Sequence, residues 1–266
     1  MSLELPGAHA LVTGASGGIG AAITRRLAGS GARLTLTGRR VGTLESLAAE
    51  VHGDSIACDL SARSDLERLL EGCGEVDLLV SNAALPASGE LTDFTPEQVD
   101  KLLDVNLRAA IVLARTLLPG MLQRGRGHLV FVASLSAKAA SPYASLYSAT
   151  KFGLRGFALS LREDLRGTGV GVSLVLPGFV SGAGMFADAG VRLPPGVGTR
   201  TPQQVAEAVI DAVLHDRAEV SVAPPLLRLA TTFATVAPGT AATLQRLAGG
   251  NRVARQFVAG QLDKRP

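Results

Sequence analysis

A glycine-rich turn between an apolar strand and a helix, close to the N-terminus, constrains the fold more than any other feature. Residues 8–13 form an apolar run bounded by glycines, which predicts a buried strand. The turn Thr13-Gly14-Ala15-Ser16-Gly17-Gly18-Ile19-Gly20 follows, and residues 21–28 favour a helix. Glycines allow a tight turn and the close approach of a pyrophosphate, and the start of a helix attracts an anion. This order of strand, turn and helix predicts a dinucleotide-binding unit.

The rest of the chain continues the alternation of strands and helices. Further strands are expected at residues 33–37, 55–57, 77–81, 128–133, 170–176 and 219–222, and further helices at 41–51, 62–73, 96–121, 147–166 and 202–215. Such alternation predicts an α/β fold with a parallel sheet covered by helices on both faces. With 266 residues, 47 % of them hydrophobic, we expect one catalytic and dinucleotide-binding domain over residues 1–222. Residues 223–266 are predicted to add helices at 226–236, 240–247 and 253–262, as an extension packed on the same domain.

Composition argues against several classes of function. The net charge is +3 and the Lys and Arg residues are scattered, so nucleic-acid binding is not expected. The four His residues lack metal-ligand spacing, so we expect no metal site. Cys58 and Cys73 form no CxxC motif, which favours a reducing, cytoplasmic compartment. No signal peptide is recognised, and glycines and a proline interrupt the long uncharged run 167–187, so no transmembrane segment is expected.

Two polar positions at predicted strand ends bear on the choice of cofactor. The second strand ends in Gly38-Arg39-Arg40, where an acid would favour the ribose of NAD, whereas Arg suits the 2′-phosphate of NADP. These residues predict NADP(H) over NAD(H), unless they are solvated turn residues. Asp59 follows the third strand and could bond the adenine amino group. It could equally cap the next helix, a role for which Ser61 and Ser64 compete.

Tyr147 and Lys151 form the strongest candidate for chemistry. Four residues apart, they lie on one face of the predicted helix. An ammonium beside a phenol favours the phenolate and lowers the Tyr pKa, which suits a general acid/base. Taken alone, the pair also fits a solvated helix face. Asn106 interrupts the apolar stripe of the predicted helix 96–121, and it is either a structural hydrogen bonder or functional.

Together these motifs resemble the short-chain dehydrogenase/reductase family over about residues 7–222. Thr13-Gly14, Gly18 and Gly20 match the cofactor loop of the family, and Asn82-Ala83-Ala84 resembles its Asn-Asn-Ala-Gly, with departures at Ser81 and Ala84. The family's catalytic tetrad is matched by Asn106, Ser134, Tyr147 and Lys151, and Ser134 stands thirteen positions before Tyr147. Pro177-Gly178 follows the sixth strand, and Ser181 stands where Thr is common. The resemblance implies a Rossmann-type, doubly wound parallel sheet of about seven strands and a classical, NADP-preferring member.

The resemblance also assigns roles to residues. Ser134 would bond the carbonyl oxygen of the substrate, Tyr147 would donate the proton, and Lys151 would lower the Tyr pKa and bond the nicotinamide ribose. Asn106 would hold a water that links Lys151 to solvent. The residues implied to bind the cofactor are Gly14, Ser16, Gly18, Ile19, Gly20, Arg39, Asp59, Leu60, Asn82, Ala83, Tyr147, Lys151, Pro177, Gly178, Val180 and Ser181.

The function predicted from the sequence is hydride transfer between NADP(H) and a carbonyl or secondary alcohol. Residues 179–200 lack periodicity and offer mostly apolar side chains, which favours an apolar substrate and a lid that is mobile until ligands bind. The alternative is a catalytically silent dinucleotide-sensing or scaffolding protein of the same fold. Family members commonly pair their helices, so a homodimer or homotetramer is expected.

Three uses of the C-terminal extension compete. It could close over the substrate site, with helix 226–236 as the opposite wall, or pack against another subunit. It could also lie on a membrane surface, which is disfavoured because Arg228 is the only charge in helix 226–236.

Overall fold

The computed structural model describes residues 3–194 and 197–264 and has one seven-stranded, fully parallel sheet. Along the sheet the strand order is β3-β2-β1-β4-β5-β6-β7. The strands are β1 His9–Thr13, β2 Arg33–Gly38, β3 Asp54–Ala57, β4 Leu78–Ser81, β5 Gly127–Val132, β6 Val170–Pro177 and β7 Glu219–Val222. The predicted Rossmann-type sheet, with its seven strands, is therefore confirmed.

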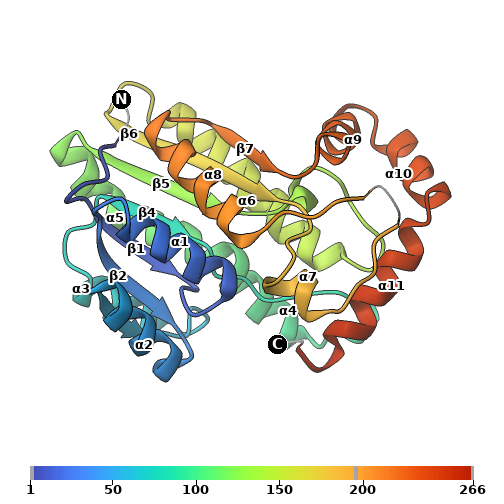
Figure 1. Ribbon diagram of the computed structural model, residues 1–266, viewed down its shortest axis with the longest axis horizontal. Coiled ribbons are helices and arrows are strands. Elements are labelled where there is room, and N and C mark those ends of the chain that lie inside the picture. The colour runs from blue at the N-terminus through green and yellow to red at the C-terminus, as the bar shows by residue number, and fades with distance from the viewer. Residues whose placement is uncertain (1–2, 195–196, 265–266) are drawn as a thin grey trace.

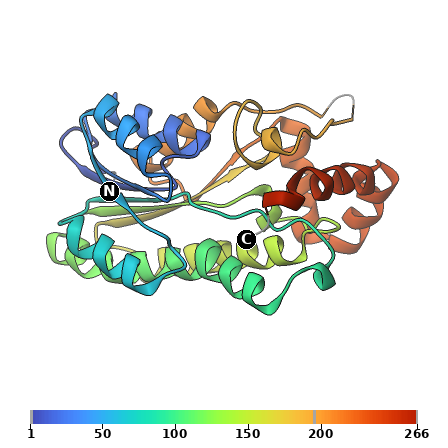
Figure 2. The same cartoon turned by 90° about the horizontal axis from the view of Figure 1, so that it is seen from below.

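Helices cover both faces of the sheet, as Figure 2 shows. One face carries α1 Gly18–Ala28, α2 Val41–Val51 and α8 Pro202–Leu214, and the other carries α3 Arg63–Gly72, α4 Pro96–Leu103, α5 Ala109–Arg124 and α6 Ser145–Asp164. Each face has its own hydrophobic core, because the strands are buried on both sides. On one side Ile23 and Val209 pack with Val12, and on the other Leu113 and Leu154 pack with Phe131.

The strand order reverses at β1, which pairs with β2 on one side and with β4 on the other. The loops that follow β1 and β4 meet at this point and are tied together. Thr13 Oγ1 accepts hydrogen bonds from the N–H groups of Asn82 (3.0 Å) and Ala83 (3.1 Å). Asn82 Nδ2 donates to the carbonyls of Thr13 (3.1 Å) and Gly14 (3.3 Å). Such a switch point is where open α/β sheets bind their ligands.

The predicted helix 96–121 is present as one helical run, 96–124, but it contains an unpredicted π-helical turn, Asp104–Arg108, between α4 and α5. The turn contains Asn106, whose Oδ1 accepts from the Leu85 N–H (2.6 Å) and whose Nδ2 donates to the Leu85 carbonyl (3.0 Å). Apolar periodicity could not reveal this turn, since α4 buries Leu102 and α5 buries an apolar stripe on either side of it. Helix α6 begins at Ser145 and ends at Asp164, two residues earlier at each end than predicted.

The C-terminal extension forms three helices beyond the carboxyl ends of the strands, drawn in red in Figures 1 and 2. They are α9 Pro225–Val236, α10 Pro238–Leu247 and α11 Gly250–Gln261. Their bounds confirm the predicted helices to within three residues. Among the described residues, one helical run, 96–124, is long and apolar enough to cross a membrane. Its buried residues, such as Leu102 and Leu113, belong to the core beneath the sheet.

Candidate active site

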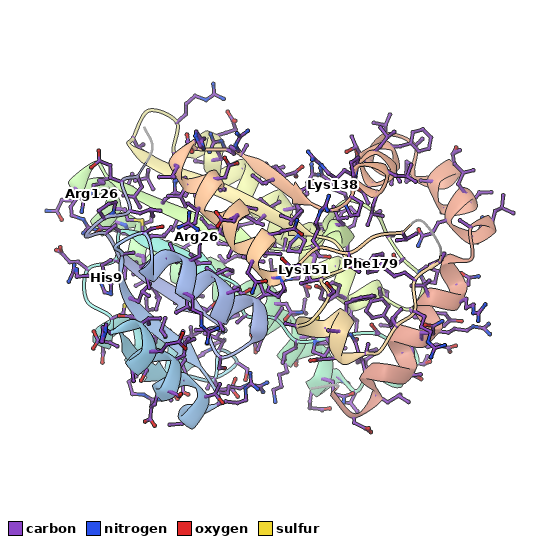
Figure 3. The ribbon with its side chains drawn as sticks, viewed as in Figure 1. His9, Arg26, Arg126, Lys138, Lys151 and Phe179 are labelled. Carbon is purple, nitrogen blue, oxygen red and sulfur yellow. The ribbon has the colours of Figure 1, made fainter. Side chains whose placement is uncertain are left out.

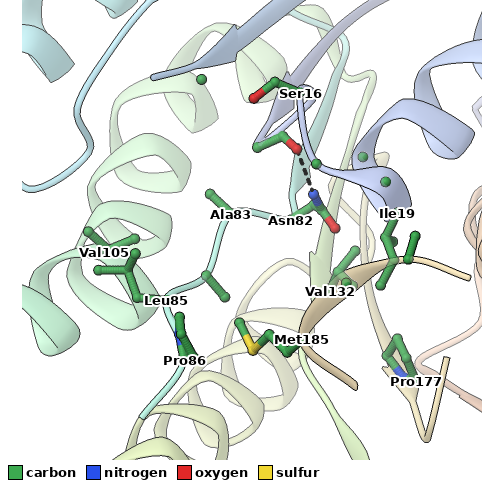
Figure 4. A pocket seen from close by; sticks show the side chains of 18 of the residues that line it. Ser16, Ile19, Asn82, Ala83, Leu85, Pro86, Val105, Val132, Pro177 and Met185 are labelled. Carbon is green, nitrogen blue, oxygen red and sulfur yellow. Dashed lines mark hydrogen bonds between the residues drawn. The ribbon is translucent and has the colours of Figure 1, made fainter. Parts of the chain in front are cut away.

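A cavity of about 570 Å³ opens at the carboxyl ends of β1, β4, β5 and β6 (Figure 4). Its wall contains fifteen of the sixteen residues predicted to bind the cofactor; only Ser181 is absent. Ser134 also lines it. Figure 3 shows Lys151 in the central part of the molecule. The fold therefore brings together residues that lie more than a hundred positions apart in the sequence.

The glycine-rich turn is shaped by two positions that exclude a side chain. Gly14 has φ +64°, and a Cβ there would lie 2.8 Å from the Cα of Ala83. A Cβ on Gly20 would overlap the carbonyl oxygen of Gly14. No side chain caps the start of α1, so the N–H groups of its first turn are free to meet an anion. These features fit the pyrophosphate of a dinucleotide.

Arg39 and Asp59 lie at the far end of the cavity, next to β2 and β3. Arg40, beside them, donates to the Ser16 carbonyl. Asp59 Oδ1 accepts from the Ser61 N–H (3.0 Å) and from its hydroxyl (2.7 Å). Burial opposes ionisation of Asp59, but the Ser61 hydrogen bonds and the charge of Arg39 hold its pKa below the usual value. The cap alternative for Asp59 is wrong, because Ala62 is the N-cap of α3. Its contact with adenine stays a prediction.

Tyr147, Ser134 and Lys151 meet in the wall of the cavity, at the ends of β5 and α6. Lys151 is 2 % exposed, its Nζ donates to the Val132 carbonyl (3.4 Å), and it lies 5.6 Å from the centre of the Tyr147 ring. Burial lowers the pKa of Lys151 to about 8. Ser134 shares a hydrogen bond with the Tyr147 side chain, and its Oγ also accepts from the Ser136 N–H (3.1 Å).

The expected lowering of the Tyr147 pKa is not found. Burial raises the pKa of Tyr147 to about 12, and only the hydrogen bond with Ser134 acts in the opposite direction. A buried phenolate is costly because the site has few polar groups to replace water. Tyr147 therefore holds its proton at neutral pH, which suits a proton donor.

Two predicted site residues lie outside the cavity wall. Asn106 is 2 % exposed and sits behind Leu85, which itself lines the cavity. Of the two alternatives for Asn106, the structural hydrogen bond is present, and the water role stays a prediction. Ser181 Oγ donates to the Arg200 carbonyl (3.3 Å), which also accepts from the Ser181 N–H (2.9 Å). Ser181 therefore closes the base of the loop rather than facing the cavity.

Comparison with known proteins agrees with this geometry. The short chain dehydrogenase family profile matches residues 8–191, more than two thirds of the chain. The chain belongs to this family. It is 37 % identical over 227 residues to the ketoacyl reductase HetN of Nostoc sp., covering 82 % of this chain and 79 % of that protein.

Solved short-chain dehydrogenases share the fold. One from Sphingobium yanoikuyae in complex with NADPH superposes with a TM-score of 0.76 at 27 % identity, covering 88 % of this chain and 94 % of that one. A metagenomic short-chain oxidoreductase in complex with NADP gives a TM-score of 0.69 at 34 % identity, covering 83 % and 99 %. This chain is thus an oxidoreductase of the short-chain dehydrogenase family, and its cradle fits a nicotinamide dinucleotide.

Residues 183–188 of this short-chain dehydrogenase line the cavity, as expected of the apolar segment 179–200, whereas the wall residue Gln261 near the C-terminus was not predicted from the sequence. Residues 179–200 lack the periodicity that predicts a helix, but they contain the short helix α7 Gly184–Asp188. Residues 195–196 of this segment lie outside the described residues. Met185 and Phe186 of α7 line the cavity, together with Gln261 at the end of α11. Helix 226–236, expected to form the opposite wall, does not line it.

Helix α11 holds this segment in place. Phe257 stacks on Phe179, with ring centres 6.2 Å apart, and lies 6.0 Å from the ring of Phe186. Gln256 Oε1 accepts from the Arg192 N–H (2.8 Å), and a Cβ on Gly260 would lie within 3 Å of the Ala189 backbone. Of the three uses weighed for the extension, closure over the site agrees with these contacts. No sequence signal marked Gln261, because its place depends on how α11 docks.

Proposed function

We propose that the protein is an NADP(H)-dependent reductase of apolar carbonyl compounds, with Tyr147 as the general acid. The observation that carries the proposal is that half-buried Tyr147 and Ser134 and the buried Lys151 stand together in one wall of the dinucleotide cavity. Tyr147 keeps its proton at neutral pH, so it can act as the proton donor when a carbonyl is reduced.

The chain's own residues supply orientation and the proton. When bound, the nicotinamide supplies the hydride. The Ser134 hydroxyl would hold the carbonyl oxygen and stabilise its developing charge. Tyr147 would donate its proton to the same oxygen. The Lys151 ammonium would stabilise the phenolate that remains and bond the nicotinamide ribose, because it is the buried cation beside the Tyr147 ring. Asn106 would keep Leu85 in place and hold a water near Lys151.

The preference for NADP(H) rests on Arg39 and Arg40. Both lie in the cavity wall beside Gly38, and no acid stands between residues 33 and 44. Two guanidinium groups suit the 2′-phosphate. The NADPH and NADP complexes among the similar structures support the same choice.

An apolar substrate is supported by the wall beyond Tyr147. Its side chains include those of Leu85, Pro86, Met185 and Phe186. The ketoacyl reductase name of the Nostoc relative makes 3-ketoacyl thioesters the first class to test. The contacts to the adenine amino group and to the nicotinamide carboxamide are proposed for Asp59 and Ser181, the latter after movement of its loop.

The test is NADPH oxidation with a panel of ketones and 3-ketoacyl thioesters. Tyr147→Phe should keep the fold and bind NADPH but lose at least about a hundredfold in turnover. Tyr143→Phe, the other tyrosine of the chain, is the matched control and should retain activity. A Tyr147→Phe rate within tenfold of wild type would contradict the proposed acid. NADPH binding by wild type without turnover of any compound would instead support the dinucleotide-sensing alternative.

We also propose the wider context of this reductase. Residues 1–222 form the catalytic domain and 223–266 an extension packed on it. Cys58 and Cys73 are buried free thiols, which agrees with a cytoplasmic setting. Leu103, Leu122 and Phe152 are exposed on α4, α5 and α6, and we propose that they pair in a homodimer or homotetramer. Light scattering that finds a monomer at micromolar concentration would contradict this assembly.

A further inference from the structure

The C-terminal lobe, defined as α9–α11, carries a concentration of exposed apolar side chains. Thirteen large apolar residues are exposed in the described part of the chain, and six of them lie on α9 and α10. Their exposed fractions run from 42 % to 83 %, and they are Leu226, Leu229, Phe233, Val236, Leu244 and Leu247. Single exposed apolar residues are ordinary, but six on two helices that contact each other are a concentration that needs an explanation.

Helix α9 is apolar on two faces. Thr231 and Ala234 are buried on the face that meets the domain. Leu226, Leu229, Phe233 and Val236 follow one another at spacings of three and four residues, so they share the face turned away from it. Helix α10, which packs on α9, has no buried residue at all along its described length. The outer face therefore contributes nothing to the core of the chain.

The same lobe is strongly cationic. Residues 223–266 contain six Lys or Arg and a single Asp, a net charge of +5, whereas residues 1–222 have a net charge of −2. Arg228, Arg246, Arg252 and Arg255 are all exposed, and none forms an ion pair with any residue that the structure describes. Helix α9 contains only Arg228 of these four arginines. Arg246 lies on α10, and Arg252 and Arg255 lie on α11.

We propose that the outer face of α9 and α10 docks on an anionic lipid surface. An exposed apolar helix face on a lobe of net positive charge suits the boundary between acyl chains and negatively charged headgroups. A second copy of the chain fits less well, because a two-fold contact would bring two segments of charge +5 together. This proposal does not depend on the identity of the substrate.

The docking face lies at the same end of the molecule as the active-site cavity. α11 lines the cavity through Gln261, and Leu227 of α9 approaches Gly178 at its inner end. Figure 1 shows the lobe next to α7, beyond the carboxyl ends of the strands. Docking through this lobe would bring the cavity close to the lipid, from which an apolar substrate could enter.

The experiment is co-sedimentation of the full-length protein with vesicles of phosphatidylcholine alone or mixed with phosphatidylglycerol. We expect retention on the mixed vesicles only, decreasing as salt increases. Leu229→Asp/Phe233→Asp and Arg228→Glu/Arg246→Glu should each weaken retention at least tenfold. Leu229→Ser/Phe233→Ser serves as the milder pair, and circular dichroism with NADPH binding verifies folding of every variant.

Matched controls lie on the helices α8 and α3. Leu214→Asp replaces an apolar side chain that is 41 % exposed at the end of α8, and Arg63→Glu reverses an exposed charge. Both controls should bind vesicles like wild type. Absence of retention on the mixed vesicles, or an equal loss in the controls, overturns the proposal. Wild-type dimers that Leu229→Asp converts to monomers, without any vesicle binding, would assign the face to a second copy instead.

Discussion

Replacing Lys151 by methionine should stabilise the protein while abolishing its proposed chemistry. Lys151 is 2 % exposed, and in the described part of the chain it has no ion-pair partner. Its ammonium meets one carbonyl, that of Val132, at 3.4 Å. Methionine has a similar length and no charge, so Lys151→Met removes the buried charge and keeps most of the packing.

The magnitude follows from the pKa of Lys151, which burial lowers from 10.5 to about 8. At pH 7 this lowering corresponds to about 3 kcal/mol of unfavourable free energy, since each pKa unit is about 1.4 kcal/mol. Lys151→Met also loses the hydrogen bond to the Val132 carbonyl, which lowers the free energy of unfolding by about 1 kcal/mol. The net gain in the free energy of unfolding should be about 2 kcal/mol, or roughly 4–8 °C in Tm for a domain of this size.

The effect has a defined dependence on pH. Below about pH 8 the amine is charged in both the folded and the unfolded chain, and the full penalty is present. Between pH 8 and 10.5 the folded protein has lost the proton that the unfolded chain still binds, so wild-type stability rises with pH relative to the variant. The difference between Lys151→Met and wild type should therefore shrink across this window.

Thermal unfolding of the cofactor-free protein, followed by circular dichroism from pH 7 to 10.5, measures both effects. Lys101→Met on α4 is the control, because this lysine is partly exposed and its replacement should change stability by less than about 0.5 kcal/mol. A Lys151→Met protein no more stable than wild type at pH 7 would refute the reasoning. So would a stability difference that stays constant up to pH 10.5.

Three further outcomes are expected. Arg39→Asp should weaken NADPH binding much more than NADH binding, measured by fluorescence titration, and equal wild-type affinities for the two would contradict the role of Arg39. For carbonyl reduction, kcat/KM should fall above about pH 8, because Lys151 loses its charge there while Tyr147 stays protonated up to about pH 12; a profile flat to pH 10 argues against this. Amides of residues 179–200 should gain protection from hydrogen exchange when cofactor and substrate bind. Phe257→Ala should raise exchange of these amides in the free enzyme, whereas Leu262→Ala, an exposed control, should not. Equal protection of the amides with and without ligands would rule out a mobile lid.

The sequence predicts most of the fold because its signals are local. The central strands β4, β5 and β6 are mostly apolar runs, and the turn at Gly14 and Gly20 works through a backbone approach that only glycine permits. Tyr147 and Lys151 could be predicted for a similar reason, since a spacing of four residues places two side chains on one helix face. Local pattern is sufficient wherever the geometry is set within one element.

Predictions from the sequence failed where the property depends on burial or on how distant elements pack together. The Tyr147 pKa depends on the surrounding desolvation, which outweighs the effect expected from Lys151. Asn106 of the π-helical turn forms hydrogen bonds with the backbone of Leu85, which lies twenty-one residues earlier in the sequence. The arginines of the C-terminal lobe are dispersed in the sequence, and the fold places them on three helices of one lobe, in which α10 contacts both α9 and α11.

The C-terminal lobe contributes both to the substrate site, through α11, and to the proposed docking face, through α9 and α10. α11 contacts α7 through Phe257 and ends with Gln261 in the cavity wall, so a change in α11 changes the shape of the substrate site. α9 and α10 attach to the same lobe, and their outer faces are free of the core. Binding of lipid or of a partner to the outer face would therefore be transmitted to α7 through α11. Because the glycine-rich turn and Tyr147 sit on the sheet and on α6, such coupling should alter KM for the substrate more than the affinity for NADPH.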